Sequence, residues 1–339
     1  MKDAAVRNYH RRLVRSRGEV PVHHCFTREE WFVRLMHMVP AGQANSRKQA
    51  VERASLITSR DNRWLKRFRA SLAGEQGSED GLVGVEGVRL VEAALGSGLL
   101  VVALLVSDSG ERHLTRLGAL LAPDVQILRT TDRLFAGIAD TQTPQGVAVL
   151  VRPKLATIED VLRGVALLVV LVGVQDPGNV GTILRSAEAF GATGAATCSA
   201  GSVGTANPLA PKALRASAGS ALRLPILRGM SSAILLAQLR VSGVKLYAAV
   251  PDTYPQEKLQ TDDAPPLLRP WEADWKSPAA LLIGNEGAGL PAEIVRAADA
   301  RVSIPQTAAA RPAGVESLNA AMAGTVLLYE AMRQRDARA

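Results

Sequence analysis

Apolar runs alternate with amphipathic segments along most of the chain, and this pattern divides it into two parts. In residues 55–152, short apolar runs typical of strands alternate with segments whose apolar residues recur at helical spacing. The expected strands are 82–85, 99–106, 125–128 and 147–151, and the expected helices are 59–69, 88–95 and 112–121. Strands and helices in this order predict a small α/β sandwich, which we call the 55–152 domain.

The second part, which we call the 165–335 domain, opens on the nearly uniform apolar run Val165–Val172. A run so rich in β-branched residues predicts a central strand that is buried on both faces. Further strands are expected at 194–197, 245–250, 279–283 and 302–304, and helices at 182–190, 231–239, 292–297 and 317–333. This alternation predicts a mostly parallel sheet, and residues 153–164 are expected to link the two domains.

Charge is unevenly distributed along the 339 residues, whose formal net charge is +8. Residues 1–70 contain 16 Lys and Arg against 6 Asp and Glu, a net charge of +10, and the remainder is slightly acidic. A basic arm on a nearly neutral body suits a polyanionic partner, most simply the phosphate backbone of RNA. For residues 1–54, a basic extension, solvated disorder is the alternative, and we assign this extension no function.

A basic helix is expected at the start of the 55–152 domain. Trp64, Leu65 and Phe68 fall at helical spacing, and Lys and Arg occupy the other face. The candidate RNA contacts of this segment are Arg60, Arg63, Lys66 and Arg67. Aromatic residues make up only 4% of the chain, which argues against base stacking on an aromatic sheet as the main mode of binding.

Composition excludes several other classes of protein. No run of eighteen apolar residues is free of charge, so the sequence predicts no membrane span. Cys25 and Cys198 form no spaced pattern, which fits a reducing, cytoplasmic setting, although the arginine-rich N terminus leaves organellar targeting open. His23-His24-Cys25 lacks a second pair of ligands at zinc-finger spacing, and we therefore expect no metal.

The first candidate site follows the strand Val165–Val172. The segment Gln175–Glu188 begins with the turn residues Asp176-Pro177-Gly178-Asn179 and continues as a helix. It has neither the Gly-Lys-Ser/Thr of a phosphate-binding loop nor the glycine spacing of a dinucleotide site. Asn179 and Arg185 could both face the strand ends, where open α/β sheets place ligands. The alternative is that Arg185 is a surface residue of the helix.

Two further motifs also stand where apolar runs end. Gly284-Asn285-Glu286-Gly287 follows the strand 279–283, and its glycines would let a ligand approach the backbone, although a plain turn before a helix is the alternative. Ser317-Leu318-Asn319 begins a helix, where Ser317 or a neighbour could cap the first turn and Asn319 could bind a ligand hydroxyl. The 165–335 domain contains no histidine, so any chemistry there uses Arg, Glu, Asn or Ser.

Together the three motifs resemble those of the SpoU (TrmH-type) RNA ribose 2′-O-methyltransferases. The similarity extends over residues 55–335, since Glu86-Gly87 and Thr143-Pro144-Gln145-Gly146 resemble that family's RNA-binding domain. The resemblance implies a small ribosomal-protein-like α/β RNA-binding domain followed by an α/β-knot domain, whose C-terminal segment would form a deep trefoil knot. It also implies S-adenosylmethionine as the cofactor and a homodimer with its active site between the subunits.

Position by position, the resemblance assigns roles within all three motifs. It implies a catalytic and substrate site formed by Asn179, Arg185, Glu286, Ser317 and Asn319. It implies a cofactor pocket lined by Gly284, Ile304, Leu318 and Ala248, and it adds Glu86 to the expected RNA contacts. One departure from the family is the loop 306–316, which is longer than expected and rich in alanine, and it bears on the assignment of Ile304.

The implied reaction is attack of a ribose 2′-oxygen on the methyl group of the cofactor. The extra RNA-binding domain favours 23S rRNA as the substrate, with transfer RNA as the alternative. A non-catalytic RNA-binding or ribosome-assembly protein on the same scaffold is the alternative from another class. Because a guanidinium is hard to deprotonate, we expect Arg185 to position phosphate and ribose and to stabilise the developing negative charge.

Overall fold

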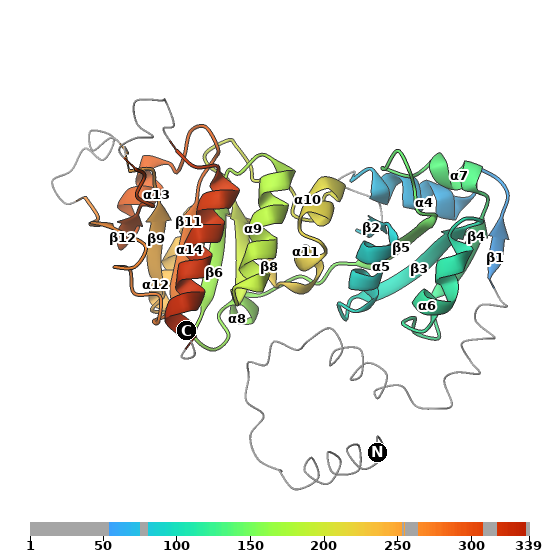
Figure 1. Ribbon diagram of the computed structural model, residues 1–339, viewed down its shortest axis with the longest axis horizontal. Helices are drawn as coiled ribbons and strands as arrows, with labels where there is room; N and C mark the ends of the chain where they lie inside the picture. Colours follow the sequence, from blue (N-terminus) through green and yellow to red (C-terminus); the bar gives the residue numbers. More distant parts are fainter. Residues whose placement is uncertain (1–53, 75–80, 253, 255–263, 308–316, 337–339) are drawn as a thin grey trace, which may run out of the picture. The chain divides into compact units, whose positions relative to one another are not determined.

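Two β-sheets, one of five strands and one of seven, organise the part of the chain that the computed structural model describes (Figure 1). The described residues are 54–74, 81–252, 254, 264–307 and 317–336. They belong to one compact unit that spans residues 49–339. The predictions made for residues 1–53, including His23-His24-Cys25, and for most of the 306–316 loop lie outside the described residues.

The five-stranded sheet is formed by the 55–152 domain. Its order is β1 (Ser55–Ile57), β4 (Gln126–Thr130), β3 (Leu100–Ser107), β5 (Val147–Arg152) and β2 (Val83–Glu86). Strand β5 runs antiparallel to both of its neighbours, and the remaining pairs are parallel. One face packs on α4 (Arg63–Leu72) and α7 (Asp132–Ala136), and the other on α5 (Val88–Leu95) and α6 (Leu114–Gly118), which follows the short η1 (Glu111–His113).

The seven-stranded sheet is formed by the 165–335 domain, and every neighbouring pair in it is parallel. Its order is β10 (Leu267–Leu268), β12 (Ala300–Val302), β9 (Lys245–Ala249), β11 (Ala279–Ile283), β6 (Leu167–Val172), β7 (Gly194–Cys198) and β8 (Ile226–Met230). All six residues of β6 are buried, as expected for a strand covered on both faces. The expected α/β class with a mostly parallel sheet is confirmed.

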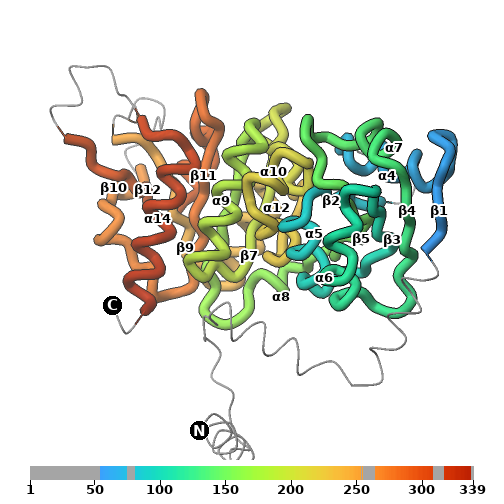
Figure 2. Tube along the Cα trace, turned by 45° about the vertical axis from the view of Figure 1, so that its right-hand side comes forward, coloured from blue at the N-terminus to red at the C-terminus, as the bar shows by residue number. Residues whose placement is uncertain are grey.

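Helices cover both faces of this sheet because its strands are apolar on both sides. In β6, Leu167, Val169 and Leu171 face α9 (Pro177–Ala189) and α14 (Ala320–Arg335), which lie side by side (Figures 1 and 2). The alternate residues of β6 face α12 (Ser232–Val241), α13 (Ala292–Arg296) and the short α8 (Ile158–Val161) of the linker. A helix able to span a membrane is not found among the described residues.

Several expected boundaries were wrong, and those of three elements near the motifs have a local cause. Helix α9 begins at Pro177, since Asp176 is its N-cap and accepts a hydrogen bond from the Gly178 N–H. Helix α14 begins at Ala320, because Asn319 and not Ser317 is the N-cap. Strand β12 ends at Val302, two residues before Ile304, because its register is set by pairing with β9.

Residues 199–230 were expected to hold no regular element, yet three lie within them. Two short helices, α10 (Pro211–Ala216) and α11 (Ser220–Arg223), precede the edge strand β8. Helix α10 packs against α9 at Gly181, where a Cβ atom would lie only 2.3 Å from the carbonyl oxygen of Ala213. Glycine is therefore required at position 181 of the first motif, because the two helices approach each other closely there.

The last turn of α14 is fixed to the starts of two central strands by Arg335. Its guanidinium donates hydrogen bonds to the carbonyl oxygens of Val165, Ala166, Trp275 and Ser277 at 2.5–2.9 Å. These carbonyls precede β6 and β11, so one side chain holds the C-terminal helix against the middle of the sheet.

We predict that Arg335→Ala lowers the free energy of unfolding by about 2–4 kcal/mol, because carbonyl groups at the strand starts lose their donor. Urea denaturation at neutral pH measures this change. The matched control is Arg333→Ala on the same helix, where the exposed guanidinium forms an ion pair with Glu330 of that helix. The control should change the free energy by less than about 0.5 kcal/mol. Equal effects for the two variants would contradict the anchoring role of Arg335.

Candidate functional site

The carboxylate of Glu286 connects the ends of the two central strands. Glu286 follows β11, and the segment that it binds follows β6, the neighbouring strand. Its Oε2 accepts a hydrogen bond from the Gln175 N–H at 3.1 Å, and its Oε1 accepts from the Asp176 N–H at 3.1 Å. Oε1 also accepts from Nδ2 of Asn179 at 2.9 Å. A single side chain of the second motif therefore fixes the backbone and the amide of the first.

Asn319 joins the third motif to the same network. Its Nδ2 donates to Oδ1 of Asn179 at 3.1 Å. Its Oδ1 accepts hydrogen bonds from the N–H groups of Ala321 and Met322, which caps the start of α14. Asn179 thus donates to Glu286 and accepts from Asn319, so three side chains from distant parts of the chain form one hydrogen-bonded row.

Glu286 remains ionised at neutral pH. Burial acts to raise the pKa of this carboxyl, but hydrogen bonds from Asn179 and from the backbone of Gln175 and Asp176 outweigh burial and lower the pKa below its ordinary value. A carboxylate with a lowered pKa is a weak proton acceptor at neutral pH. Its arrangement suits holding Asn179 in one orientation rather than removing a proton from a substrate.

The turn after β11 is held by Asn285. Its Oδ1 accepts from the N–H groups of Gly287 and Ala288, and its Nδ2 donates to the Gly173 carbonyl at 2.9 Å. The turn also folds back on Gly284, where a Cβ atom would lie 2.3 Å from the backbone of Gly289. The second motif therefore needs glycine at position 284 to close its own turn.

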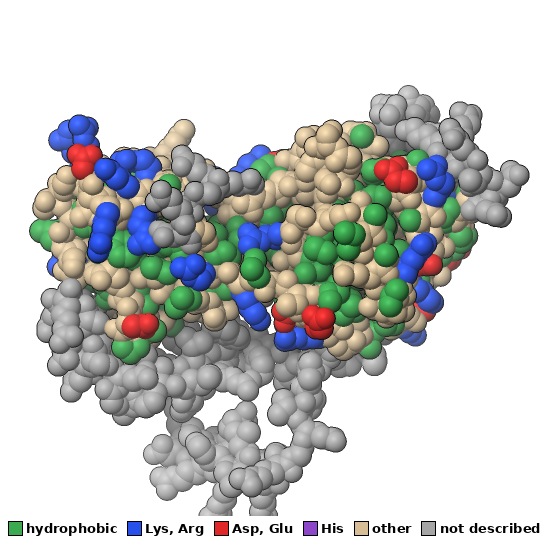
Figure 3. Space-filling model, turned by 180° about the vertical axis from the view of Figure 1, so that it is seen from behind, with side chains coloured by type: hydrophobic (Ala, Val, Ile, Leu, Met, Phe, Trp, Pro, Cys, Tyr) green, Lys and Arg blue, Asp and Glu red, His purple; other side chains and the backbone are tan. Residues whose placement is uncertain are grey.

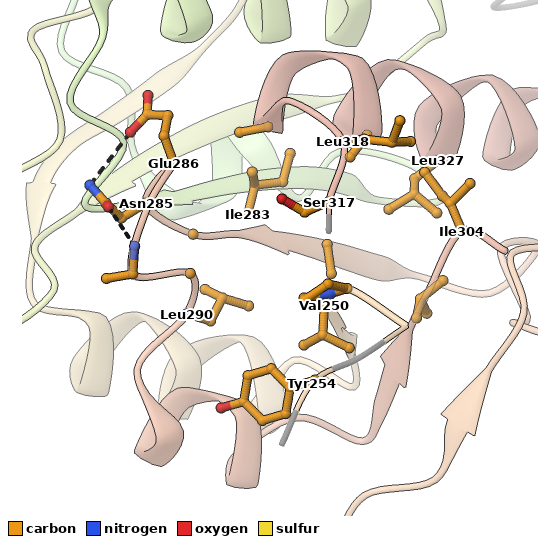
Figure 4. Close-up of a pocket in the computed structure, with 18 of the residues that line it drawn as sticks. Val250, Tyr254, Ile283, Asn285, Glu286, Leu290, Ile304, Ser317, Leu318 and Leu327 are labelled. Atoms are coloured by element: carbon orange, nitrogen blue, oxygen red, sulfur yellow. Dashed lines mark hydrogen bonds between the residues drawn. The ribbon is translucent and has the colours of Figure 1, made fainter. Parts of the chain in front are cut away.

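A cavity of about 220 Å³ opens beside this network. Its walls come from the ends of β9, β11 and β12 and from the start of α14. The larger apolar side chains that line it are Val250, Ile283, Leu290, Ile304, Leu318 and Leu327. Figure 4 shows Glu286 and Asn285 at one end of the cavity, and Ile304 and Leu327 at the other. The cavity thus pairs an apolar interior with a polar, hydrogen-bonded rim.

Three of the four residues expected in the cofactor pocket line this cavity, and the fourth does not. Gly284, Ile304 and Leu318 line the cavity, and so does Ser317. Ala248 is not among the lining residues, and its side chain is fully buried in the cluster that includes residues of α12 and α13. Side chains alternate along a strand, so the wall at this point begins with Ala249, one residue later.

Arg185 stands apart from the row formed by Asn179, Glu286 and Asn319. It is exposed on α9, and the described part of the chain gives its side chain no hydrogen bond or ion pair. Six residues of α-helix separate it from Asn179, which corresponds to roughly 9 Å along the axis and about 120° around it. The two side chains therefore point in different directions within one chain.

The basic residues expected to contact RNA lie on and beside α4. Arg60, Arg63 and Lys66 are exposed, and the guanidinium groups of Arg63 and Arg67 lie 5.9 and 4.8 Å from the Trp64 ring centroid. On the face shown in Figure 3, Lys and Arg side chains are spread widely and do not gather in one patch. An extended polyanion fits such a distribution better than a small anion does.

Glu86, the other expected RNA contact, is almost fully buried. Its Oε2 accepts from the Asp140 N–H at 2.8 Å, and its Oε1 accepts a very short hydrogen bond from the Thr141 hydroxyl. The carboxylate thus holds the 140–146 loop in place. A direct contact of Glu86 with RNA stays a prediction.

Sequence reasoning gave no role to three residues of the site. Asn285 stood within a quoted motif, and its ability to hold a turn was the available signal. Tyr254 lines the cavity from a segment that was read only as a polar, proline-rich excursion. Lys212, which donates to the Asp176 carboxylate at 2.6 Å, belongs to a helix that was not expected.

Comparison with known proteins identifies the family. The model of the SpoU rRNA Methylase family matches residues 166–329, and the model of the MRM3-like substrate binding domain matches residues 76–149. An uncharacterized tRNA/rRNA methyltransferase of Synechocystis sp. is 33% identical over 287 residues, which cover 82% of this chain and 94% of that protein. The chain belongs to the SpoU rRNA methylase family. The resemblance inferred from the three motifs is thereby confirmed.

Other relatives of this SpoU-family chain have more specific names. The 23S rRNA (guanosine(2553)-2'-O)-methyltransferase RlmP of Bacillus subtilis is 29% identical over 277 residues, which cover 80% of this chain and 97% of that protein. The crystal structure of an AdoMet-bound rRNA methyltransferase from Sinorhizobium meliloti has a TM-score of 0.68 and 28% identity. The similarity covers 83% of this chain and 98% of that structure. Both domains therefore have counterparts in these relatives.

We predict that Glu286→Gln lowers kcat by roughly a hundredfold, because an amide presents an NH₂ group to N–H donors and releases Asn179. The change also removes a group with a lowered pKa. Wild type should therefore be more stable than the variant above pH 4.5, the ordinary value, and should lose this advantage as pH falls through the lowered pKa. Urea denaturation at pH 7 and pH 3.5 measures the difference.

The control for this change is Glu293→Gln, which alters an exposed carboxyl of α13. It should leave kcat within about twofold of wild type. Normal activity of Glu286→Gln would contradict the role of the carboxylate in holding the row of side chains.

Proposed function

We propose that this chain transfers a methyl group from S-adenosylmethionine to a ribose 2′-hydroxyl of 23S rRNA. The observation that carries the proposal is the hydrogen-bonded row of Asn179, Glu286 and Asn319, of which Glu286 lines the apolar cavity. The names of the relatives support the reaction and the substrate class. The match of residues 76–149 to a substrate binding domain supports RNA as the partner.

The cavity suits this cofactor in two respects. Its apolar side chains can surround a purine ring and a thioether chain, and Gly284, Ile304 and Leu318, together with Ala249, would hold these parts. Glu286 is the only charged side chain among the described lining residues, and an ionised carboxylate at the rim favours a cationic sulfonium centre. When bound, S-adenosylmethionine supplies the activated methyl group.

The protein's part in the reaction is to orient the ribose and to stabilise charge. Ser317 lines the cavity, and Asn319, two residues further along the chain, binds Asn179, so that both can hold ribose hydroxyls. Glu286 fixes Asn179 and is too weak a base to take the 2′-hydroxyl proton, so this proton leaves to solvent as the carbon–oxygen bond forms. Arg185 binds the adjoining phosphate and stabilises negative charge on the attacking oxygen.

Arg185 reaches this site from a second subunit in the proposed homodimer. The outer face of α14 carries an apolar stripe, Met322, Val326 and Tyr329, whose exposed fractions are 61, 43 and 51%. Residues at this spacing share one side of a helix, and such a stripe favours burial against another surface. Ser186, next to Arg185, bonds to Thr325 of α14 at 2.7 Å, so Arg185 lies near the stripe.

A deep trefoil knot is the other structural part of the proposal. Strand β12 lies near one edge of the sheet, but the next described element, α14, packs on the central strand β11 and on α9. Strand β12 and helix α14 thus lie at different parts of the sheet, and this arrangement supports the proposed knot. Action in the cytoplasm belongs to the same proposal.

We predict that the purified protein binds S-adenosylmethionine in a calorimetric titration and adds one ribose methyl group to 23S rRNA, detected by mapping positions resistant to alkaline hydrolysis. Arg185→Ala should lower kcat at least a hundredfold, and Arg185→Lys at least tenfold, because lysine lacks the planar fork. Absence of cofactor binding would favour a non-catalytic RNA-binding protein. Activity of Arg185→Lys near that of wild type would contradict the role given to the guanidinium.

The shared site predicts complementation between two inactive variants. Arg185→Ala and Asn319→Ala should each be inactive as homodimers, whereas their purified heterodimer has one site free of both changes and should regain up to about half of the wild-type activity. Two different affinity tags allow the heterodimer to be isolated, and light scattering verifies the dimer. An inactive heterodimer, or a monomeric wild type, would contradict the proposal.

A further inference from the structure

Helix α10 lies between α9 and the 55–152 domain. It belongs to none of the three motifs, and no role has yet been assigned to it. It packs closely on α9, as the contact between Gly181 and Ala213 shows. Its two basic side chains, Lys212 and Arg215, form ion pairs with carboxylates of different domains. The helix therefore has bonded contacts on both sides.

On one side, Lys212 binds the segment that carries the first motif. Its Nζ lies 2.6 Å from Oδ1 of Asp176, the N-cap of α9, and the same oxygen accepts the Gly178 N–H. The backbone N–H of Asp176 in turn donates to Glu286. Lys212 thus holds the residue that links the helix cap to the row of Asn179, Glu286 and Asn319.

On the other side, Arg215 binds the 55–152 domain. Its guanidinium forms a short ion pair with the Asp140 carboxylate. The backbone N–H of Asp140 is itself held by the buried Glu86, and so is the Thr141 hydroxyl. Arg215 therefore binds a loop that Glu86 fixes to the core of the 55–152 domain. The loop cannot simply move together with Arg215.

Two steric contacts reinforce this connection. A Cβ atom on Gly74 would lie 2.8 Å from Cδ of Pro211, the first residue of α10. A Cβ atom on Gly219, in the turn after α10, would lie 2.7 Å from Cβ of Ala93 in α5. Gly219 has φ +84°, a conformation that glycine adopts without strain. The domain thus touches both ends of α10 as well as Arg215.

We propose that Lys212 and Arg215 are positioning residues for methyl transfer, and that α10 fixes the distance between RNA held by the 55–152 domain and the row of Asn179, Glu286 and Asn319. This inference rests on the proposed function. Each ion pair is partly exposed, with side-chain exposures of 42 and 34% for Arg215 and Asp140, so neither contributes much to stability. Their effect is geometric, since a misplacement of about 1 Å at a reacting centre can slow a reaction up to a hundredfold.

The test compares Arg215→Ala, Asp140→Ala, both changes together and the charge exchange Asp140→Arg with Arg215→Asp. For each protein, single-turnover methyl transfer to saturating 23S rRNA is measured beside the affinities for RNA and S-adenosylmethionine and the melting temperature. The matched control is Arg116→Ala, which breaks an ion pair with Glu92 that lies wholly within the 55–152 domain.

We expect each single change to slow the transfer step roughly tenfold, and the double change to be no worse than either, because both break one connection. The charge exchange should restore the rate to within about threefold of wild type. Both affinities should stay within twofold, and the control should behave as wild type. Lys212→Ala should slow the same step, and Lys212→Arg should restore it.

Several outcomes would overturn the inference. These are an unchanged rate in Arg215→Ala, a loss in proportion to a lower melting temperature, or a charge exchange without recovery. A loss confined to RNA affinity would make Arg215 a phosphate contact and would also overturn it. A wild type that transfers no methyl group contradicts the proposed function itself, whereas equal activity of wild type and Arg215→Ala contradicts only the role of α10.

Discussion

The site depends on one ionised carboxylate that is held by neutral donors. Glu286 accepts two backbone N–H groups from the segment after β6 and the amide of Asn179, and these hydrogen bonds lower the pKa of its carboxyl and keep it charged. Adjacent parallel strands end at the same edge of the sheet, but their connections would otherwise be free to move apart. The carboxylate draws these connections together, and Asn319 then attaches the C-terminal helix to them. The orientation of the side chains in the site therefore depends on the hydrogen bonds that Glu286 makes to the segment after β6.

The residues of the site serve the fold and the site at the same time. Asn319 caps α14 with its oxygen and reaches Asn179 with its nitrogen. Asp176 caps α9 with its carboxylate and binds Glu286 through its backbone. Because the same atoms end helices and shape the rim of the cavity, a change at these positions affects local stability and binding together.

The sequence was sufficient for the fold class but not for every contact of the site. The uniform run that became β6 and the alternation after it predicted a parallel sheet, because burial on both faces requires such composition. To predict the contact of Asn179 with Glu286, one would need to know that β6 and β11 are neighbours in the sheet. A local sequence pattern does not contain the strand order. Helix α10 escaped notice because it is short and its buried positions are set by the packing of Ala213 on Gly181. The assignment of Ala248 to the cofactor pocket stays a prediction, since Ala249 and not Ala248 lines the cavity.

The groups that donate hydrogen bonds to Glu286 are uncharged. The network around Glu286 and the basic residues expected to bind RNA should therefore respond differently to ionic strength. Salt weakens attractions between full charges, so contacts of Arg63 and Lys66 with phosphate groups would diminish steeply as counterions compete for them. Hydrogen bonds from amide groups to a carboxylate within one folded chain have no mobile counterion to exchange. The hydrogen bonds to Glu286 should therefore depend less on salt than the binding of RNA does, so the two steps respond differently to ionic strength.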